Sequence, residues 1–391
     1  MRLYFQTLIL ILVVTQMSNA QGVRFEQGSW AEVQAKAKAT NKFIFVDAVT
    51  ATCSPCKWME KEVFPKKAVD AFFNKHFINY KFFMEKGEGI AFAKKYNVFG
   101  YPTSLYFTPL GKLVHRNIGA LDDQDLLREG RNALNPQKQY YTLKQQYESG
   151  KSDPEFLKNY VIAAAWNGMS EIKPSYYNKL VSRYLTKVGK ARWSTRVEWK
   201  FIQQYALDIQ SEAFAYVMKH PDKFTNQKEV DQYREKVIGV RSYQVIRSSN
   251  ASTLNKYKEL LQNLLGAKAA PVIAEVTYKF YQRRKEATFE QAQQYFDQYC
   301  NDEYELNQGA EWVRQQYTTK DKLEVALKWV NKSINLEANA DNTETKGRLL
   351  FKLLHYAEAR KAVEQALEFA KKEKRDMQAL TSLLEDIKSK L

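Results

Sequence analysis

The spacing of apolar residues changes near residue 137 of this 391-residue chain. Upstream, short apolar runs typical of buried strands alternate with segments whose apolar residues recur every three or four positions, as on one helix face. Downstream, only the helical spacing continues. Eight of the 15 glycines and five of the nine prolines precede Gln137, so turns are concentrated in the first part. The pattern predicts two units of different architecture, covering residues 21–137 and 138–391.

The first unit is predicted to alternate helices and strands. Ser29 and Glu32 have capping-box spacing, in which each side chain binds a free backbone N–H, and they open a helix through Ala39. The resulting order α-β-α-β-α-β-β-α predicts an α/β fold with a mixed sheet flanked by helices. After the first helix we expect a strand over 42–48, helical faces at 59–63 and 69–73, a strand over 77–83, a helix over 89–96, strands over 104–107 and 112–116, and a helix over 122–134.

The second unit is predicted to be an all-α helical-repeat domain. Asp153-Pro154-Glu155 supplies an N-cap, a proline at the first helical position and an acid in the first turn. From Gly347 to Ala366, small, apolar and aromatic residues stand where tetratricopeptide repeats place them, although Leu354 occupies the usual turn glycine. Strict self-similarity is not seen upstream. Helical spacing also covers 176–185, 201–215, 260–265, 272–281 and 329–336.

The N-terminus has the pattern of a secretory signal peptide over residues 1–20. Arg2 precedes an apolar stretch from Leu8 to Val14, and the small residues Ser18 and Ala20 mark a cleavage site after Ala20. No later segment approaches the ~18 consecutive apolar residues of a spanning helix. The sequence therefore predicts a periplasmic or secreted protein with no membrane span in the mature chain.

The net charge of +16 raises the question of a nucleic-acid partner. The lysines are dispersed rather than gathered in a tract, which favours a solvated helical surface and argues against nucleic acid. Contact with anionic envelope material or with an acidic partner stays open. The helices are also rich in tyrosine, which we interpret as packing residues in preference to a ligand groove; these are Tyr140, Tyr141, Tyr160, Tyr176, Tyr177, Tyr295 and Tyr299.

Cysteine is scarce, and two of the three cysteines lie close together just past the predicted strand at 42–48. Cys53-Ser54-Pro55-Cys56 has the spacing of a redox dithiol, whose thiols can close a small disulfide. A helix beginning there would hold the first sulfur at its positive N-terminal end, where a thiolate is stabilised. The remaining Cys300 is expected to be a small buried side chain in a helix; an intermolecular or regulatory thiol is the alternative.

Other residues around this pair support redox chemistry. Asp47 ends the preceding strand, where burial would raise its pKa and allow it to exchange a proton with the second cysteine. Pro102 can hold a cis peptide bond beside the sulfurs, and the backbone of Tyr101 can pair with an extended substrate. Lys57 adds positive charge near the thiolate. The alternatives are a structural disulfide, a zinc site, a hydrogen-bonded core Asp47 and an ordinary turn proline at 102.

These motifs resemble the thioredoxin family over roughly residues 24–135. The resemblance rests on the Asp47 offset, Cys-x-Pro-Cys-Lys at 53–57, Gly-x-Pro-Thr at 100–103 and Gly119-Ala120-Leu121. Thr52 and Ser54 replace the tryptophan and glycine usual beside the cysteines. The chain also looks similar to secreted bacterial thioredoxin-like proteins with long helical C-terminal regions.

The resemblance implies a thiol-disulfide oxidoreductase that works without a metal or an organic cofactor. Cys53, as the more exposed sulfur, would attack, and Cys56 would resolve the mixed disulfide. Gly119 and Ala120 would contact substrate. The implied partners are protein disulfide substrates and a thiol-transfer redox partner, with reduction favoured over oxidation and with the helical domain binding protein. An adaptor or chaperone-like module with a secondary dithiol is the alternative function.

Overall fold

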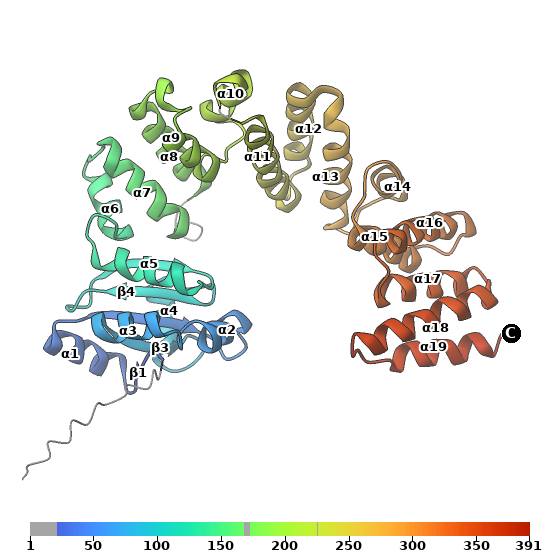
Figure 1. The fold of residues 1–391 in the computed structure, drawn as a ribbon, viewed down its shortest axis with the longest axis horizontal. Coiled ribbons are helices and arrows are strands. Elements are labelled where there is room, and N and C mark those ends of the chain that lie inside the picture. The colour runs from blue at the N-terminus through green and yellow to red at the C-terminus, as the bar shows by residue number, and fades with distance from the viewer. Residues whose placement is uncertain (1–21, 168–172, 225) are drawn as a thin grey trace, which may run out of the picture. The chain divides into compact units, whose positions relative to one another are not determined.

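The computed structural model describes residues 22–167, 173–224 and 226–391, so the expected signal peptide lies outside the described residues. The chain divides into two compact units between Arg234 and Glu235. The first contains the sheet and the first helices of the helical region (Figure 1). The boundary expected near Gln137 therefore falls inside the first unit.

The sheet of the first unit is mixed, as the sequence predicts. Its order is β1-β3-β2-β4-β5, with β1 and β2 parallel to β3, and β4 antiparallel to both β2 and β5. The sequence does not predict β1, because this strand is only two residues long and carries no alternating pattern. The strands are β1 (Phe25–Glu26), β2 (Phe43–Val49), β3 (Phe77–Phe83), β4 (Thr103–Phe107) and β5 (Leu113–Ile118).

Helices cover both faces of this sheet because β2 is buried on both sides. Side chains alternate along a strand, so Ile44 and Val46 pack with α1 (Trp30–Thr40) and α4 (Glu88–Lys95). Phe45 faces the opposite way. It packs with α2 (Ser54–Glu62), α3 (Lys67–His76) and α5 (Asp123–Leu134).

The helical part of the first unit begins directly on the sheet, because α6 and α7 both pack against β5. The helical spacing expected over 201–215 is divided between two helices, since Ser211 caps α10 by accepting a hydrogen bond from the Phe214 N–H. The helices are α6 (Tyr140–Glu148), α7 (Pro154–Asn167), α8 (Pro174–Val188), α9 (Arg196–Tyr205), α10 (Glu212–Lys219) and α11 (Gln227–Arg247), which continues into the second unit.

Helices joined by turns and short loops make up the described residues of the second unit. Its core contains Cys300, which is buried but lies just after α14 and not within a helix. Burial raises the pKa of the Cys300 thiol. After α11 come α12 (Ala251–Leu265), α13 (Ala270–Gln282), α14 (Phe289–Gln298), α15 (Glu303–Gln316), α16 (Lys320–Leu336), α17 (Ala340–Lys352), α18 (Tyr356–Lys372) and α19 (Gln378–Lys388).

The repeat-like stretch forms the helix pair α17 and α18. A Cβ atom on Gly347 would lie 2.5 Å from Cγ2 of Val363, so the two helices approach closely where the sequence places a small residue. Leu354 adopts φ 64° between the helices, a left-handed conformation that a glycine would adopt without strain. The tetratricopeptide-like pattern thus corresponds to a closely packed helical hairpin.

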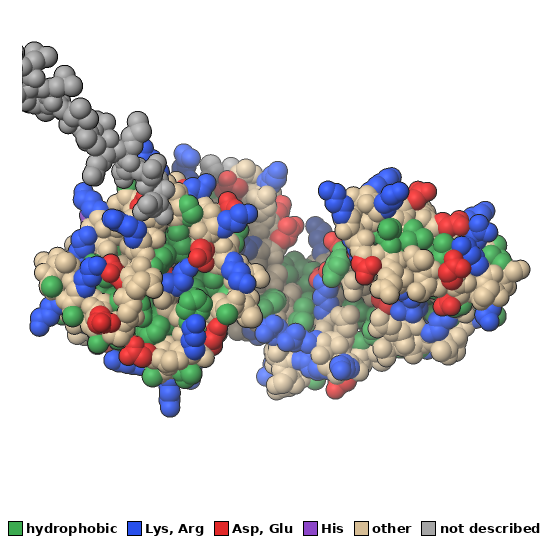
Figure 2. Space-filling view, turned by 90° about the horizontal axis from the view of Figure 1, so that it is seen from below, with side chains coloured by type: hydrophobic (Ala, Val, Ile, Leu, Met, Phe, Trp, Pro, Cys, Tyr) green, Lys and Arg blue, Asp and Glu red, His purple; other side chains and the backbone are tan. Residues whose placement is uncertain are grey.

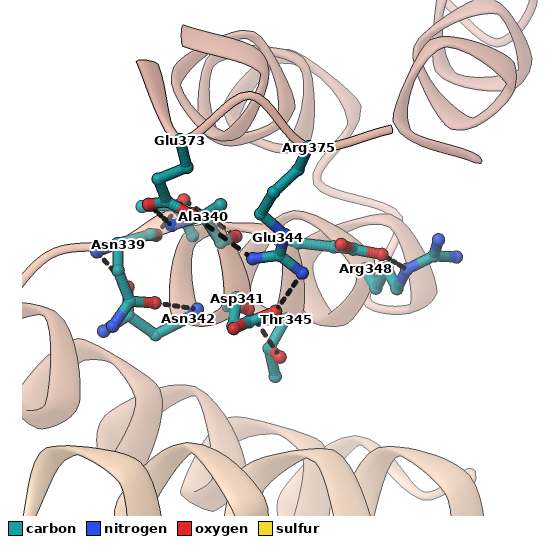
Figure 3. Close-up of polar contacts among 10 residues, drawn as sticks. Asn339, Ala340, Asp341, Asn342, Glu344, Thr345, Arg348, Glu373 and Arg375 are labelled. Atoms are coloured by element: carbon teal, nitrogen blue, oxygen red, sulfur yellow. Dashed lines mark hydrogen bonds and ion pairs between the residues drawn. The ribbon is translucent and has the colours of Figure 1, made fainter. Parts of the chain in front are cut away.

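Polar contacts fix the start of α17 against the turn that follows α18 (Figure 3). Asn339 caps α17 by accepting from the Asn342 N–H. Arg375 forms a 2.7 Å ion pair with Asp341, and the Glu373 carboxylate accepts from the Ala340 N–H at 3.3 Å. These contacts hold the turn before α19 in place.

On the face in Figure 2, Lys and Arg side chains are scattered, with Asp and Glu between them. Among the described residues, no helix has the length and apolar character needed to cross a membrane.

Candidate active site

Cys53 and Cys56 are joined by a disulfide at the start of α2. The sulfurs are 1.97 Å apart and the Cα atoms 5.3 Å apart. Cys53 is the N-cap of α2, and its Sγ accepts a hydrogen bond from the Cys56 N–H at 3.2 Å. This is the end of the helix where the backbone N–H groups are free to stabilise negative charge.

The two cysteines are almost equally buried. Cys53 is 7% exposed and Cys56 is 6% exposed, so the larger exposure expected for Cys53 is absent from this oxidised structure. Val49 forms a buried cluster with the pair, and Phe83 and Tyr101 pack against this cluster. The disulfide is therefore covered by β2, by the end of β3 and by the loop before β4.

Asp47 is buried in β2, with only 2% of its surface exposed. It shares a face of the strand with Val49, which packs on the disulfide, because residues two apart point the same way. The pKa of Asp47 is raised to about 7, mainly by burial. The positive charge of Lys81 lowers this pKa, and the negative charge of Glu60 raises it. Asp47 Oδ1 has no hydrogen-bond partner among the described residues, which counts against a purely structural, hydrogen-bonded carboxyl.

Lys81 and Glu60 form an ion pair beside Asp47, which is an addition to the site residues predicted from the sequence. Lys81 stands opposite Asp47 in the pairing of β2 with β3, and its Nζ lies 2.7 Å from Glu60 Oε1 on α2. Lys81 is the one charged residue in the apolar strand β3, and that isolation is the signal that could have drawn attention to it.

The peptide bond between Tyr101 and Pro102 is cis. Pro102 is buried, and its carbonyl accepts from the Gly119 N–H at 2.9 Å. The Tyr101 backbone N–H and C=O bind no other group within the described parts of the chain. Gly119 is partly exposed and Ala120 is exposed, which leaves the backbone beside the cis bond accessible.

Lys57 follows Cys56 and is exposed, and it makes no ion pair with any described residue. The sequence pattern does not identify Phe83 as a site residue, because its contact with the cluster of Val49, Cys53 and Cys56 joins segments that lie far apart in the chain. Within the described residues, no group of three or more His, Cys, Asp or Glu side chains is arranged to hold a metal ion.

A second buried polar group lies on β5 and joins the sheet to the helical region. His115 Nε2 lies 2.9 Å from Glu129 Oε2, and the Tyr140 N–H donates to His115 Nδ1 at 3.1 Å. The ring therefore carries its proton on Nε2. Burial raises the pKa of Glu129, but hydrogen bonds from His115 and Arg128 outweigh it and bring the pKa to about 2.

The region around the disulfide matches a known protein family. Residues 30–134 match the family model of the thioredoxin-like domain. This part of the chain is a thioredoxin-like domain. It contains the whole arrangement of Asp47, the cysteine pair and the cis proline, whereas the helical region that follows is outside the match.

Solved structures of several proteins are similar to the thioredoxin-like domain. The solution structure of a "putative disulphide-isomerase" from Bacteroides thetaiotaomicron is 40% identical, with 29% of this chain and 94% of that chain covered and a TM-score of 0.28. The solution structure of a thioredoxin from Thermus thermophilus is 23% identical, with 29% of this chain and 88% of that chain covered and a TM-score of 0.27. The structure of a DsbH oxidoreductase is 19% identical, with 32% of this chain and 92% of that chain covered and a TM-score of 0.27. No curated protein matches the chain.

Proposed function

We propose that this protein is an exported thiol-disulfide oxidoreductase that reduces protein disulfides through Cys53 and Cys56, with the helical region binding protein partners. The observation that carries this proposal is the cysteine pair at the start of α2, packed against Tyr101 of the cis peptide bond. Asp47 supports it as a nearby buried carboxyl whose pKa is raised to about 7.

In the reduced protein, the Cys53 thiolate attacks one sulfur of a client disulfide. A mixed disulfide forms, and the other client sulfur leaves as a thiolate that takes a proton. Cys56 then loses its proton to the Asp47 carboxylate and attacks Cys53 Sγ, which releases the second client thiol. The client gains two electrons and two protons, and the protein is left with the Cys53–Cys56 disulfide.

A thiol-transfer partner must return two electrons to begin another cycle. The start of α2 favours the Cys53 thiolate, because the Cys56 N–H already points at this sulfur. The free backbone of Tyr101 suits pairing with an extended client segment, and the accessible backbone at Gly119 and Ala120 lies next to it. Lys57 adds positive charge that further favours the thiolate.

The test is reduction of a model protein disulfide by the dithiothreitol-reduced full chain. We expect Cys53→Ser to abolish the reaction. Cys56→Ser should retain the first step and accumulate mixed disulfides with clients in the envelope fraction. Cys300→Ser is the matched control and should keep wild-type activity, since Cys300 lies in the second unit. Unchanged reduction by the Cys53→Ser variant would contradict the proposal.

An adaptor or chaperone-like role is the second candidate. It is favoured by large apolar side chains exposed on the helices, among them Val197, Tyr243 and Tyr304, each more than 60% exposed. If the double variant Cys53→Ser/Cys56→Ser keeps the cellular phenotype of the wild type, the helical region performs the main task and the dithiol is secondary.

Export by the N-terminal signal peptide is part of the proposal. The full chain expressed in a bacterial host should reach the periplasm or the medium with a mature N-terminus at Gln21. If the protein stays in the cytoplasm with residues 1–20 still attached, the proposal of export is contradicted. That result would not bear on the chemistry of the cysteines.

A further inference from the structure

The segment from Phe83 to Gly89 borders the disulfide and is fixed to the loop that carries Cys53. The Met84 N–H donates to the Val49 carbonyl at 2.9 Å. One residue further on, the Glu85 carboxylate accepts from the Ala51 N–H at 2.7 Å. The end of β3 is thus fastened to the Thr50–Thr52 loop just before Cys53.

The same segment turns back tightly on itself. A Cβ atom at Gly89 would lie 1.8 Å from the Phe83 carbonyl oxygen, a contact that no other residue type could make. Gly87 has a φ of 53°, in the left-handed region. Because the turn is fixed at both ends, Lys86 at its tip has a defined position.

Lys86 lies over the ring of Phe83, with 4.5 Å between its Nζ atom and the ring centroid. Phe83 itself packs against the buried cluster that Val49 forms with Cys53 and Cys56. Such a cation–π contact holds an ammonium group on an aromatic face while leaving it open to water. One aromatic ring therefore lies between an exposed positive charge and the cluster that contains the disulfide.

The Lys86 ammonium makes no ion pair with any described residue. The carboxylate of its neighbour Glu85 is bound to the Ala51 N–H instead. A cation held at the edge of a reactive site, with its charge unmatched, is available to a carboxylate on an incoming molecule.

We propose that Lys86 is a specificity-determining residue that selects client segments with an acidic side chain close to the cysteine under attack. The inference rests on the oxidoreductase function proposed above and leaves its chemical steps unchanged. A client carboxylate near Lys86 stabilises the encounter with Cys53, whereas a client lysine is repelled from the same place.

The experiment measures the second-order rate constant of the reduced full chain with two matched peptides. Each carries one cysteine in a mixed disulfide with a reporter thiol, flanked by two Glu in one peptide and two Lys in the other. We expect wild type to react about fivefold faster with the acidic peptide at low salt, the size of a favourable exposed ion pair. High salt should reduce this ratio.

Lys86→Met keeps most of the aliphatic stem on Phe83 and removes the charge, so the ratio should fall towards one. Lys86→Glu should favour the basic peptide. Lys94→Met is the matched control, since Lys94 is an exposed lysine without an ion pair on α4, and it should keep the wild-type ratio. The reduction potential of the Lys86→Met protein should equal that of wild type, which separates selection of clients from a change in the dithiol.

Two outcomes overturn the inference in distinguishable ways. If wild type and Lys86→Met react with both peptides at the same ratio, Lys86 does not select clients and the oxidoreductase function stands. If reduced wild type reacts with neither peptide faster than Cys53→Ser does, the proposed function fails and the inference fails with it.

Discussion

The backbone N–H of Tyr140 donates to Nδ1 of the buried His115 at 3.1 Å, which ties the first helix of the helical region to the last strand of the sheet. Both α6 and α7 pack on this strand. The thioredoxin-like domain therefore has a face that depends on residues beyond its own C-terminal end.

This relationship predicts that a fragment of residues 21–137 is less stable than one of residues 21–167. The shorter fragment leaves His115 Nδ1 without its donor and exposes apolar surface of β5 to water, which together cost about 2 kcal/mol or more. Thermal unfolding followed by circular dichroism compares the two. Equal melting temperatures would show that the boundary expected at Gln137 separates independent domains and that cleavage near 135–138 leaves the first one intact.

The raised pKa of Asp47 predicts that the stability of the oxidised protein depends on pH. Its pKa is about 7 in the folded chain, well above the 3.8 of a free carboxyl. Between these values the folded state holds a proton that the unfolded state has lost, so wild-type stability falls as pH rises from about 4 to about 7. Urea unfolding at several pH values measures this fall.

Asp47→Asn removes that titration, so its stability should change less over the same range. Above pH 7 the variant should be more stable than wild type, by on the order of 4 kcal/mol, while the difference largely disappears near pH 4. An identical pH profile for the two proteins would show that Asp47 is an ordinary solvated acid. Loss of the proton acceptor should also slow release of the client by Cys56.

Lys81 and Glu60 should shift the pKa of Asp47 in opposite directions. Removing the positive charge with Lys81→Met raises the pKa of Asp47, and removing the negative charge with Glu60→Gln lowers it. Carboxyl titration by isotope-edited infrared or NMR spectroscopy reads these shifts. As a control, Glu62→Gln on the same helix should leave the titration unchanged. Shifts of the same sign in both variants would exclude this electrostatic arrangement.

Leu354 is expected to destabilise the C-terminal hairpin. It is 68% exposed and holds φ at 64°, a conformation that costs an ordinary residue about 1–2 kcal/mol. Leu354→Gly should therefore raise the unfolding free energy of the second unit by about 0.5–1 kcal/mol, after the entropy cost of glycine. Leu354→Ala keeps the strain and should have little effect. Calorimetry of the full chain distinguishes these cases; destabilisation by glycine would mean that the Leu354 side chain makes a needed contact.

Local patterns predicted much of the architecture. The apolar run over 77–83 corresponds to β3 at both ends, because a strand buried on both faces needs apolar side chains on both. The capping box at Ser29 and Glu32 is present in α1, since it depends only on residues three apart. By contrast, β1 is a strand because it pairs with β3, and no pattern within its two residues predicts this pairing.

The sequence alone determined the order of elements and the candidate chemistry. Cys53 and Cys56 are close in the chain, so their spacing and the helix that follows are local properties that do not depend on the rest of the molecule. Tertiary structure alone decided the contacts between distant segments: Lys81 opposite Asp47, Phe83 against the cluster that contains the disulfide, and the Tyr140 N–H on His115. The physical reason is that burial and Coulomb interactions depend on distance in space, and folding brings together residues that lie far apart in the chain.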